Sequence, residues 1–166
     1  MTGDALTRRA VLTGIAATGA LSVVADGIAA SLRARPSLAI TVDDFRFFDG
    51  PLSPEECNSA ILKALDKHGL RACAFPAGKF VDSPEGRRRV ATWADKGHAI
   101  GCHGYAHSYY SGKDPAAFAA DLDQALPMVR GYPTSVPLFR FPFLAEGRTA
   151  EARDAGRAAE RNRKVS

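Results

Sequence analysis

The stretch SLAITVDD, residues 37–44, is apolar and β-branched, and it ends on two neighbouring carboxylates, Asp43 and Asp44. This composition is typical of a buried strand. Three further segments have strand character, and helical segments separate them. The expected strands are 37–44, 71–78, 98–103 and 137–143, and the expected helices start after Ser53, Ser83 and Asp114, with a fourth helical stretch at 146–164.

The expected helices alternate regularly with the strands. Each of the first three begins with a capping residue followed by proline and ends at a glycine, Gly69, Gly97 or Gly131. The alternation predicts an α/β fold with a parallel sheet. Right-handed crossovers then place the carboxyl ends of all strands on one rim, where ligands of parallel α/β folds bind.

Polar side chains gather at three of the expected strand ends: Asp43 and Asp44, then His103 and His107, then Arg140. Two histidines four residues apart, with a carboxylate from another strand, can bind one divalent ion and leave a position open for water. Each signal is weak alone, since His-x-x-x-His also occurs without a metal and an aspartate pair often caps the next helix. Together on one rim, they indicate a metal site.

The composition is that of a soluble globular protein: of 166 residues, 46% are apolar and 24% are charged. The formal net charge is +4, and the basic run Arg87–Arg89 lies in a segment with helical spacing. A solvated helix face explains this run, so we predict no nucleic-acid partner. Three cysteines without Cys-x-x-Cys spacing indicate neither a zinc knuckle nor a disulfide framework. A thiolate ligand at Cys102 is disfavoured, because a residue next to His103 in a strand points to the opposite face.

Residues 1–30 look like a twin-arginine signal peptide. Arg8 and Arg9 precede an uncharged run, Ala10 to Ala25, that is rich in alanine and glycine. The run is shorter than the roughly 20 residues that span a bilayer. We predict export by the twin-arginine machinery to the periplasm or the cell exterior; an uncleaved membrane anchor and an ordinary hydrophobic N-terminal segment are the alternatives.

Three motifs resemble those of the NodB-homology polysaccharide deacetylases, carbohydrate esterase family four. The family's Thr-Phe-Asp-Asp-Gly motif has its counterpart at 41–45, its His-x-x-x-His motif at 103–108 and its Arg-x-Pro-[Tyr/Phe] motif at 140–143. They stand in the family's order at the expected strand ends. The resemblance implies that residues 36–166 form a NodB-homology domain with the fold of a distorted (β/α) barrel.

The resemblance also implies metal-dependent hydrolysis of N-acetyl groups on a polysaccharide or oligosaccharide. Asp44, His103 and His107 would hold a divalent metal, normally Zn²⁺, and Asp43 would be the general base that deprotonates the attacking water. Arg140 would pair with Asp43 and orient it. These roles agree with the chemistry, because a metal ion acidifies water and a nearby carboxylate can accept the proton.

Further roles follow from the same resemblance for residues around the third motif. The backbone N–H of Phe143 would help to stabilise the oxyanion. Tyr105, Pro142 and Phe143 would contribute to the substrate site. Tyr105 could equally pack beside the site without touching the substrate.

The chain departs from the family pattern at two places. Phe45 stands where most relatives have glycine, and its ring is expected to narrow or reshape the cleft. After the third motif, a later acidic-aromatic motif and the Leu-x-x-His motif that supplies the general acid are missing. We therefore expect a partial barrel without its C-terminal strands, an unpaired sheet edge and impaired activity. The alternatives are a non-catalytic remnant that binds metal or glycan, and a hydrolase of a small amide or cyclic imide.

Overall fold

The computed structural model describes residues 38–46 and 50–163. The expected signal segment, residues 1–30, lies outside these residues, so its assignment stays a prediction. Among the described helices, none combines the length and the apolar character needed to cross a bilayer.

The described residues form strands and helices in alternation, as the sequence predicted. A single helical turn, α3, adds an element that the sequence did not indicate. In chain order the elements are β1 (Ile40–Asp44), α2 (Pro54–Lys67), β2 (Ala72–Pro76), α3 (Gly78–Val81), α4 (Pro84–Asp95), β3 (Ala99–Cys102), α5 (Pro115–Val129), β4 (Ser135–Phe139), η1 (Pro142–Leu144) and α6 (Ala150–Asn162).

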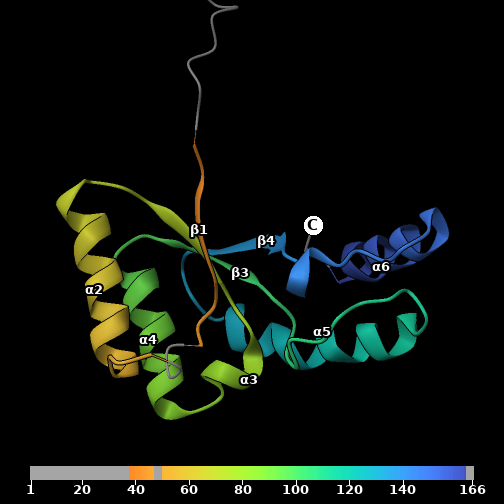
Figure 1. Cartoon of the computed structure of the whole chain (residues 1–166), viewed down its shortest axis with the longest axis horizontal. Coiled ribbons are helices and arrows are strands. Elements are labelled where there is room, and N and C mark those ends of the chain that lie inside the picture. The colour runs from red at the N-terminus through yellow and green to blue at the C-terminus, as the bar shows by residue number, and fades with distance from the viewer. Residues whose placement is uncertain (1–37, 47–49, 164–166) are drawn as a thin grey trace, which may run out of the picture. The chain divides into compact units, whose positions relative to one another are not determined.

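The strands form one parallel sheet in the order β1-β2-β3-β4 (Figure 1). Each strand pairs with the next one in the sequence, which is how successive βα units are arranged in a (β/α) barrel. The register sets Asp43 opposite Phe75 and Asp44 opposite Pro76. The parallel α/β fold of a partial barrel is therefore confirmed, and the carboxyl ends of the strands share one rim.

Local capping explains where the helices begin. Ser53 starts α2 with a capping box: its Oγ accepts a hydrogen bond from the Glu56 N–H at 3.3 Å, and the Glu56 carboxylate accepts one from the Ser53 N–H at 2.8 Å. Ser83 and Asp114 cap α4 and α5 as predicted. Thr149 caps α6, which therefore begins later than expected. The capped helices pack in pairs, α2 beside α4 and α5 beside α6 (Figure 1).

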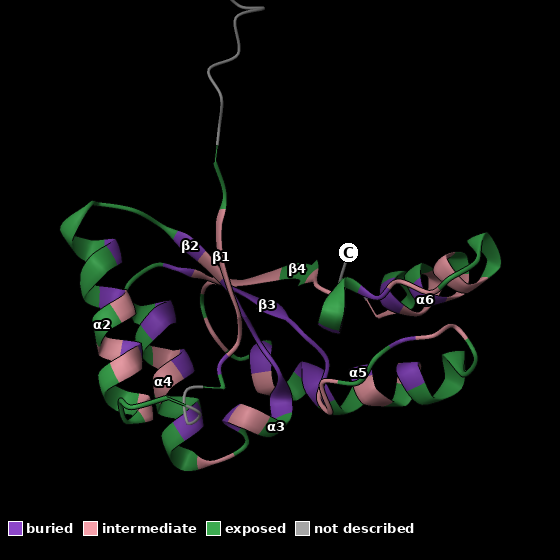
Figure 2. Cartoon of the chain, viewed as in Figure 1, coloured by how far each residue is buried: buried purple, intermediate pink, exposed green. Residues whose placement is uncertain are grey.

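The core lies around the two central strands. β2 and β3 are mostly buried, whereas β1 and β4 at the sheet edges are partly exposed (Figure 2). Trp93, Ile100 and Leu122 are fully buried. Phe45 joins them, with its ring centre 5.3 Å from that of Trp93 and no surface exposed to solvent. The expectation that the Phe45 ring narrows the cleft is therefore wrong, because the ring packs in the core.

The fourth strand ends earlier than predicted. It covers 135–139 instead of 137–143, and the 3₁₀ turn η1 follows it. Pro142 has no N–H to donate to a strand ladder, and Phe143 and Leu144 have left-handed φ angles of 58° and 54°. The third motif therefore lies where the backbone leaves the sheet.

The basic run of α4 is ion-paired. Arg87 contacts Asp82 at 2.6 Å, and Arg88 contacts Glu85 at 2.8 Å. Arg89 contacts Glu55 of α2 at 2.5 Å. The run is thus a helix face that acidic neighbours partly neutralise, in line with the structural interpretation of its sequence.

Candidate metal centre

Asp44 is the last residue of β1 and the centre of a tight turn. The Phe45 N–H donates a hydrogen bond to the Asp43 carbonyl oxygen at 2.8 Å, which closes a three-residue turn around Asp44. The φ angle of Asp44 is 67°, in the left-handed region that is costly for a residue with a side chain. Such strain is often found at functional sites.

His103 follows β3 directly and is held by the end of β4. Its Nδ1–H donates to the Arg140 carbonyl oxygen at 2.7 Å, and the Arg140 N–H donates to the Cys102 carbonyl oxygen at 2.9 Å. Because a carbonyl can only accept, this contact keeps the imidazole proton on Nδ1 and leaves the Nε2 lone pair free for a ligand. The Nε2 atom lies 3.0 Å from Asp44 Oδ1.

His107 reaches the same carboxylate oxygen from the loop after β3. Its Nε2 lies 2.9 Å from Asp44 Oδ1, and its backbone is left-handed with a φ of 53°. The rings of Phe80 and Phe143 flank it, with centre-to-centre distances of 5.8 and 4.7 Å. Burial lowers the pKa of His107, and this effect outweighs the opposing effect of Asp44. The ring is therefore neutral at neutral pH and can offer a lone pair.

Asp44, His103 and His107 together form a candidate metal site. One ligand atom from each residue lies within 4.8 Å of the other two. Ligand atoms of a tetrahedral zinc ion, at bonds of about 2.0–2.2 Å, lie roughly 3 to 3.5 Å apart. The two distances from Asp44 Oδ1 to the imidazole nitrogens, 3.0 and 2.9 Å, are close to this range. The structure thus brings together the three residues predicted as ligands. Cys102 lies in the hydrophobic core instead, where burial raises the pKa of its thiol to about 12.

Asp43 precedes Asp44 in β1 and faces Arg140. The Arg140 Nη1 atom is 3.5 Å from Asp43 Oδ2, and the guanidinium carbon lies 4.9 Å from the centre of the Phe75 ring. Gly101 makes room for that ring, since a Cβ on Gly101 would come within 2.5 Å of Phe75 Cε1. Asp43 Oδ1 is buried and has no hydrogen-bond partner among the described residues. One oxygen of this carboxylate can therefore accept a proton from a bound molecule.

Asp121 of α5 holds the loop that carries His107. Its two carboxylate oxygens accept hydrogen bonds from the N–H groups of Tyr105 and Ala106 at 2.8 and 2.7 Å. Gly104 is needed at the start of the loop, because its φ is +74° and a Cβ there would come within 2.6 Å of Asp121 Oδ2. No sequence pattern distinguishes Asp121 from other acidic helix residues, so sequence reasoning missed it, as it missed Phe75.

The residues predicted to face a substrate have different surroundings. Phe143 is 63% exposed and lies against His107. Tyr105 donates its hydroxyl hydrogen to Asp82 Oδ2 at 2.9 Å, and Pro142 is buried. Of the three, Phe143 has the side chain most open to solvent beside the cluster.

Comparison with known proteins identifies a family and a fold. The polysaccharide deacetylase family model matches residues 32–160. No curated protein matches the chain. A family 4 carbohydrate esterase from Streptomyces lividans, solved with acetate, has a TM-score of 0.61 and 22% identity; the match covers 80% of this chain and 61% of that one.

Two further solved structures have the same fold. A family 4 acetyl xylan esterase from Clostridium thermocellum, solved with a cobalt ion, has a TM-score of 0.54 and 23% identity, covering 71% of this chain and 51% of that one. A CE4-family pseudoenzyme from Bacillus anthracis has a TM-score of 0.57 and 20% identity, covering 74% of this chain and 40% of that one. The chain therefore spans between 40% and 61% of the length of these three structures.

Proposed function

The chain belongs to the polysaccharide deacetylase family, and from this membership we propose that it hydrolyses N-acetyl groups on a glycan with the help of a divalent cation. The observation that carries the proposal is the convergence of one ligand atom each from Asp44, His103 and His107 within 4.8 Å of one another. Zn²⁺ is our first choice of ion, because two imidazole nitrogens and one carboxylate oxygen suit it and leave a position open.

Two features of the histidines suit them to bind a cation: the hydrogen bond that orients His103 and the neutral state of His107. His103 is oriented by the Arg140 carbonyl, and His107 is kept neutral by burial. A divalent cation bound there would polarise the acetyl carbonyl and make water more acidic. Both imidazoles approach the same oxygen of Asp44, Oδ1, at 3.0 and 2.9 Å.

Asp43 has the surroundings of a general base. Arg140 faces its Oδ2 atom at 3.5 Å and keeps the carboxylate in place, while Oδ1 is buried without a partner among the described residues. The free oxygen can take the proton of a water molecule that attacks the acetyl carbonyl. Phe143 borders the same space and can contact the substrate.

The test compares metal content and acetate release in full-length variants. Asp43→Asn should keep its metal, measured by elemental analysis, and lose about 10²–10⁴-fold in acetate release from N-acetylglucosamine oligomers. His103→Ala should lose the metal, whereas His68→Ala at the exposed end of α2 is the matched control and should keep it. An Asp43→Asn variant as active as the parent would refute the proposal.

A non-catalytic role is the second candidate, because one structural neighbour is a pseudoenzyme and the chain covers only part of each compared structure. In that case the parent chain would bind the metal through the same three residues and release no acetate. The assay therefore separates the two candidates.

We also propose that residues 1–30 direct export to the periplasm or beyond through the twin-arginine machinery. The support is the pair Arg8 and Arg9 ahead of a long uncharged run. Replacing both arginines by lysine should leave the protein in the cytoplasmic fraction. Export that is unchanged in this variant would contradict the assignment.

A further inference from the structure

The short helix α3 bridges the two segments that carry the candidate metal ligands. Three consecutive N–H groups at its start, those of residues 77–79, donate hydrogen bonds to carbonyl oxygens outside the helix. The first donates to Asp44 at 3.2 Å, and the next two donate to Gly104 and Tyr105 at 2.9 and 3.0 Å. The end of β1 and the loop after β3 are thus both attached to α3, a turn that no motif of the sequence indicates.

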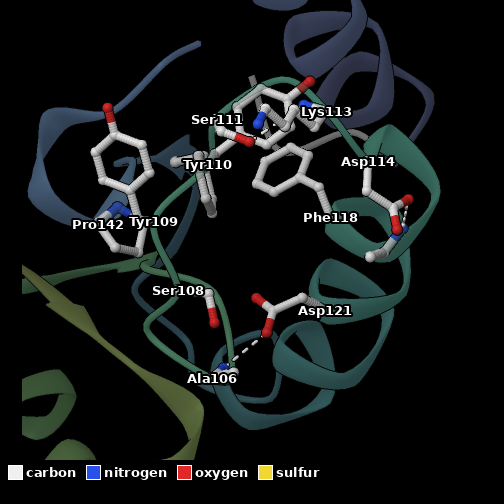
Figure 3. Close-up of a pocket in the computed structure, with 12 residues that line it drawn as sticks. Ala106, Ser108, Tyr109, Tyr110, Ser111, Lys113, Asp114, Phe118, Asp121 and Pro142 are labelled. Carbon is white, nitrogen blue, oxygen red and sulfur yellow. Dashed lines mark hydrogen bonds between the residues drawn. The ribbon is translucent and has the colours of Figure 1, made fainter.

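The helix α5 holds the same loop by its other backbone groups. Asp121 accepts hydrogen bonds from the N–H groups of Tyr105 at 2.8 Å and Ala106 at 2.7 Å, the second of which Figure 3 shows. His107 follows directly, and the Phe80 ring of α3 lies 5.8 Å from its ring, centre to centre. The position of His107 therefore depends on α3 as well as on Asp121.

The side chain of Tyr105 contacts both ends of α3. A Cβ on Gly78, the first residue of the helix, would come within 2.4 Å of Tyr105 Cδ2, so the ring lies directly against this glycine. The Tyr105 hydroxyl group donates to Oδ2 of Asp82, the residue that follows the helix, at 2.9 Å. Asp82 is itself held by Arg87, which contacts its other oxygen at 2.6 Å. Because the acceptor is a carboxylate, the bond from Tyr105 is stronger than one between neutral groups.

The backbone of two candidate ligands needs support from its surroundings. Asp44 has a φ of 67° and His107 a φ of 53°, both in the left-handed region. Residues with a side chain keep such angles only where neighbouring contacts fix them. The bonds from α3 to the Asp44 carbonyl and to the loop before His107 are contacts of this kind.

We propose that Tyr105 is a positioning residue of the metal centre. It clamps α3 against the loop after β3, through Gly78 and Asp82, and so keeps Asp44 and His107 at the spacing that a shared cation requires. The inference rests on the proposed function for the nature of the site. It assigns Tyr105 to the support of the metal ligands in place of the predicted contact with the substrate.

The first test removes only the hydroxyl group. Tyr105→Phe in the full-length chain should lower the affinity for Zn²⁺ by about three- to tenfold, measured by competition with an indicator dye. It should also change the visible absorption of bound Co²⁺, which reports the geometry of the ligands and which a general loss of stability would not alter. Tyr132→Phe is the matched control, because the Tyr132 hydroxyl group donates to the Arg87 carbonyl oxygen at 3.2 Å and its loss should change neither measurement.

Two further variants test the route through α3. In an Asp82→Ala background, Tyr105→Phe should cause no additional loss of Zn²⁺ affinity, since the acceptor of its hydroxyl group is already missing. Gly78→Ala forces the Tyr105 ring away from α3 and should lower the affinity by about 10–100-fold. Gly131→Ala, with nothing within 4 Å of its Cβ position, should keep the affinity of the parent chain. Unfolding midpoints in urea show that each variant is folded.

Unchanged Zn²⁺ affinity in folded Tyr105→Phe and Gly78→Ala chains would overturn the inference, as would an equal effect of Tyr105→Phe with and without Asp82. A higher KM for N-acetylglucosamine oligomers at unchanged Zn²⁺ affinity would return Tyr105 to the substrate site. The acetate assay tests the proposed function separately. A parent chain that releases no acetate, but whose variants lose Zn²⁺ affinity as expected, contradicts the proposed function and supports the positioning role. A parent chain that binds no Zn²⁺ contradicts both.

Discussion

Gly101 is not part of the metal centre, yet its missing side chain decides where Phe75 can lie. The Phe75 ring occupies the space that a Cβ on Gly101 would enter, at 2.5 Å from Phe75 Cε1, and it supports the guanidinium group of Arg140. Arg140 in turn faces Asp43. We infer that Gly101 and Phe75 position Asp43, the proposed general base, indirectly through Arg140.

Gly101→Ala should therefore reduce acetate release while the metal content stays at that of the parent chain. The added methyl group has to displace the Phe75 ring, and overpacking of this kind costs about 1–3 kcal/mol of unfolding free energy, measurable in urea. Gly131→Ala is the control, because nothing lies within 4 Å of its Cβ position. Equal acetate release by the two variants would show that Phe75 has no positioning role.

At the scale of single residues, the sequence was sufficient to predict the three residues of the candidate metal site, and it was insufficient to predict the residues that hold them in place. Asp44, His103 and His107 could be predicted because a short motif carries each of them and the ends of parallel strands meet. Phe75 and Asp121 act through contacts with residues distant in the sequence, and neither belongs to a motif. Phe45 was misjudged because a comparison of residue types does not show which way a ring points.

Among the elements, the loop between β3 and α5 is held by a single side chain of α5, that of Asp121. Asp121 accepts the N–H groups of Tyr105 and Ala106, and His107 follows them directly. Asp121→Asn replaces one acceptor oxygen by a donor that faces a backbone N–H group. We expect the affinity for Zn²⁺ to fall about 10–100-fold, as is usual when a group supporting a metal ligand is lost.

Competition titration with a metal indicator dye measures this loss in Asp121→Asn. Asp123→Asn is the matched control on the same helix, because Asp123 pairs with Arg163 through its side chain. Unfolding midpoints of both variants show whether the fold is retained. Unchanged Zn²⁺ affinity in a folded Asp121→Asn chain would mean that the loop holds its shape without this residue.

The helix α6 carries an unusual acidic residue on its buried side. Glu160 is 7% exposed, and its Oε1 atom has no hydrogen-bond partner among the described residues. Burial, together with the nearby charge of Glu146, raises the pKa of Glu160 to about 7. Its unfolded-state pKa is lower, so the folded chain loses stability as the pH rises from the unfolded value through about 7.

Glu160→Gln should therefore stabilise the chain above pH 7, by up to about 3 kcal/mol, and leave stability nearly unchanged below pH 4.5. Urea unfolding at several pH values measures the difference between variant and parent. Asp154→Asn, exposed on the same helix, should show no such pH-dependent gain. Parallel stability profiles for Glu160→Gln and the parent would contradict the raised pKa.

The elements themselves were predictable to different degrees. The helices α2, α4 and α5 have strong local signals at their starts, and the structure confirms Ser53, Ser83 and Asp114 as caps. The end of β4 was misplaced because the apolar run continues into the third motif, whereas the backbone turns away at Pro142. Such a turn requires left-handed φ angles at Phe143 and Leu144, which their residue types do not indicate.

At the scale of the whole domain, the site exists because the fold is parallel. The residues at the ends of β1, β3 and β4 are far apart in the sequence, and only parallel strands joined by crossovers bring their carboxyl ends to one rim. This general rule is the reason that the constellation could be predicted from a single sequence. The cavity of about 340 Å³ lined by the loop after β3, α5, β4 and η1 could not, because no motif describes how these four segments pack.

A cation that joins the ends of β1 and β3 should also stabilise the domain as a whole. An ion that binds only the folded chain adds about 2.7 kcal/mol when its free concentration is 100 times its Kd, so Zn²⁺ should raise the unfolding temperature measured by circular dichroism. His107→Ala removes one ligand and should abolish the shift, while His68→Ala should keep it. Protons compete with the ion for the imidazole nitrogens, so the rise in unfolding temperature should vanish in acid. Because burial lowers the pKa of His107, the rise should persist to a pH slightly below the ordinary histidine pKa of about 6.5. A shift of equal size in His107→Ala would place the stabilising ion elsewhere on the chain.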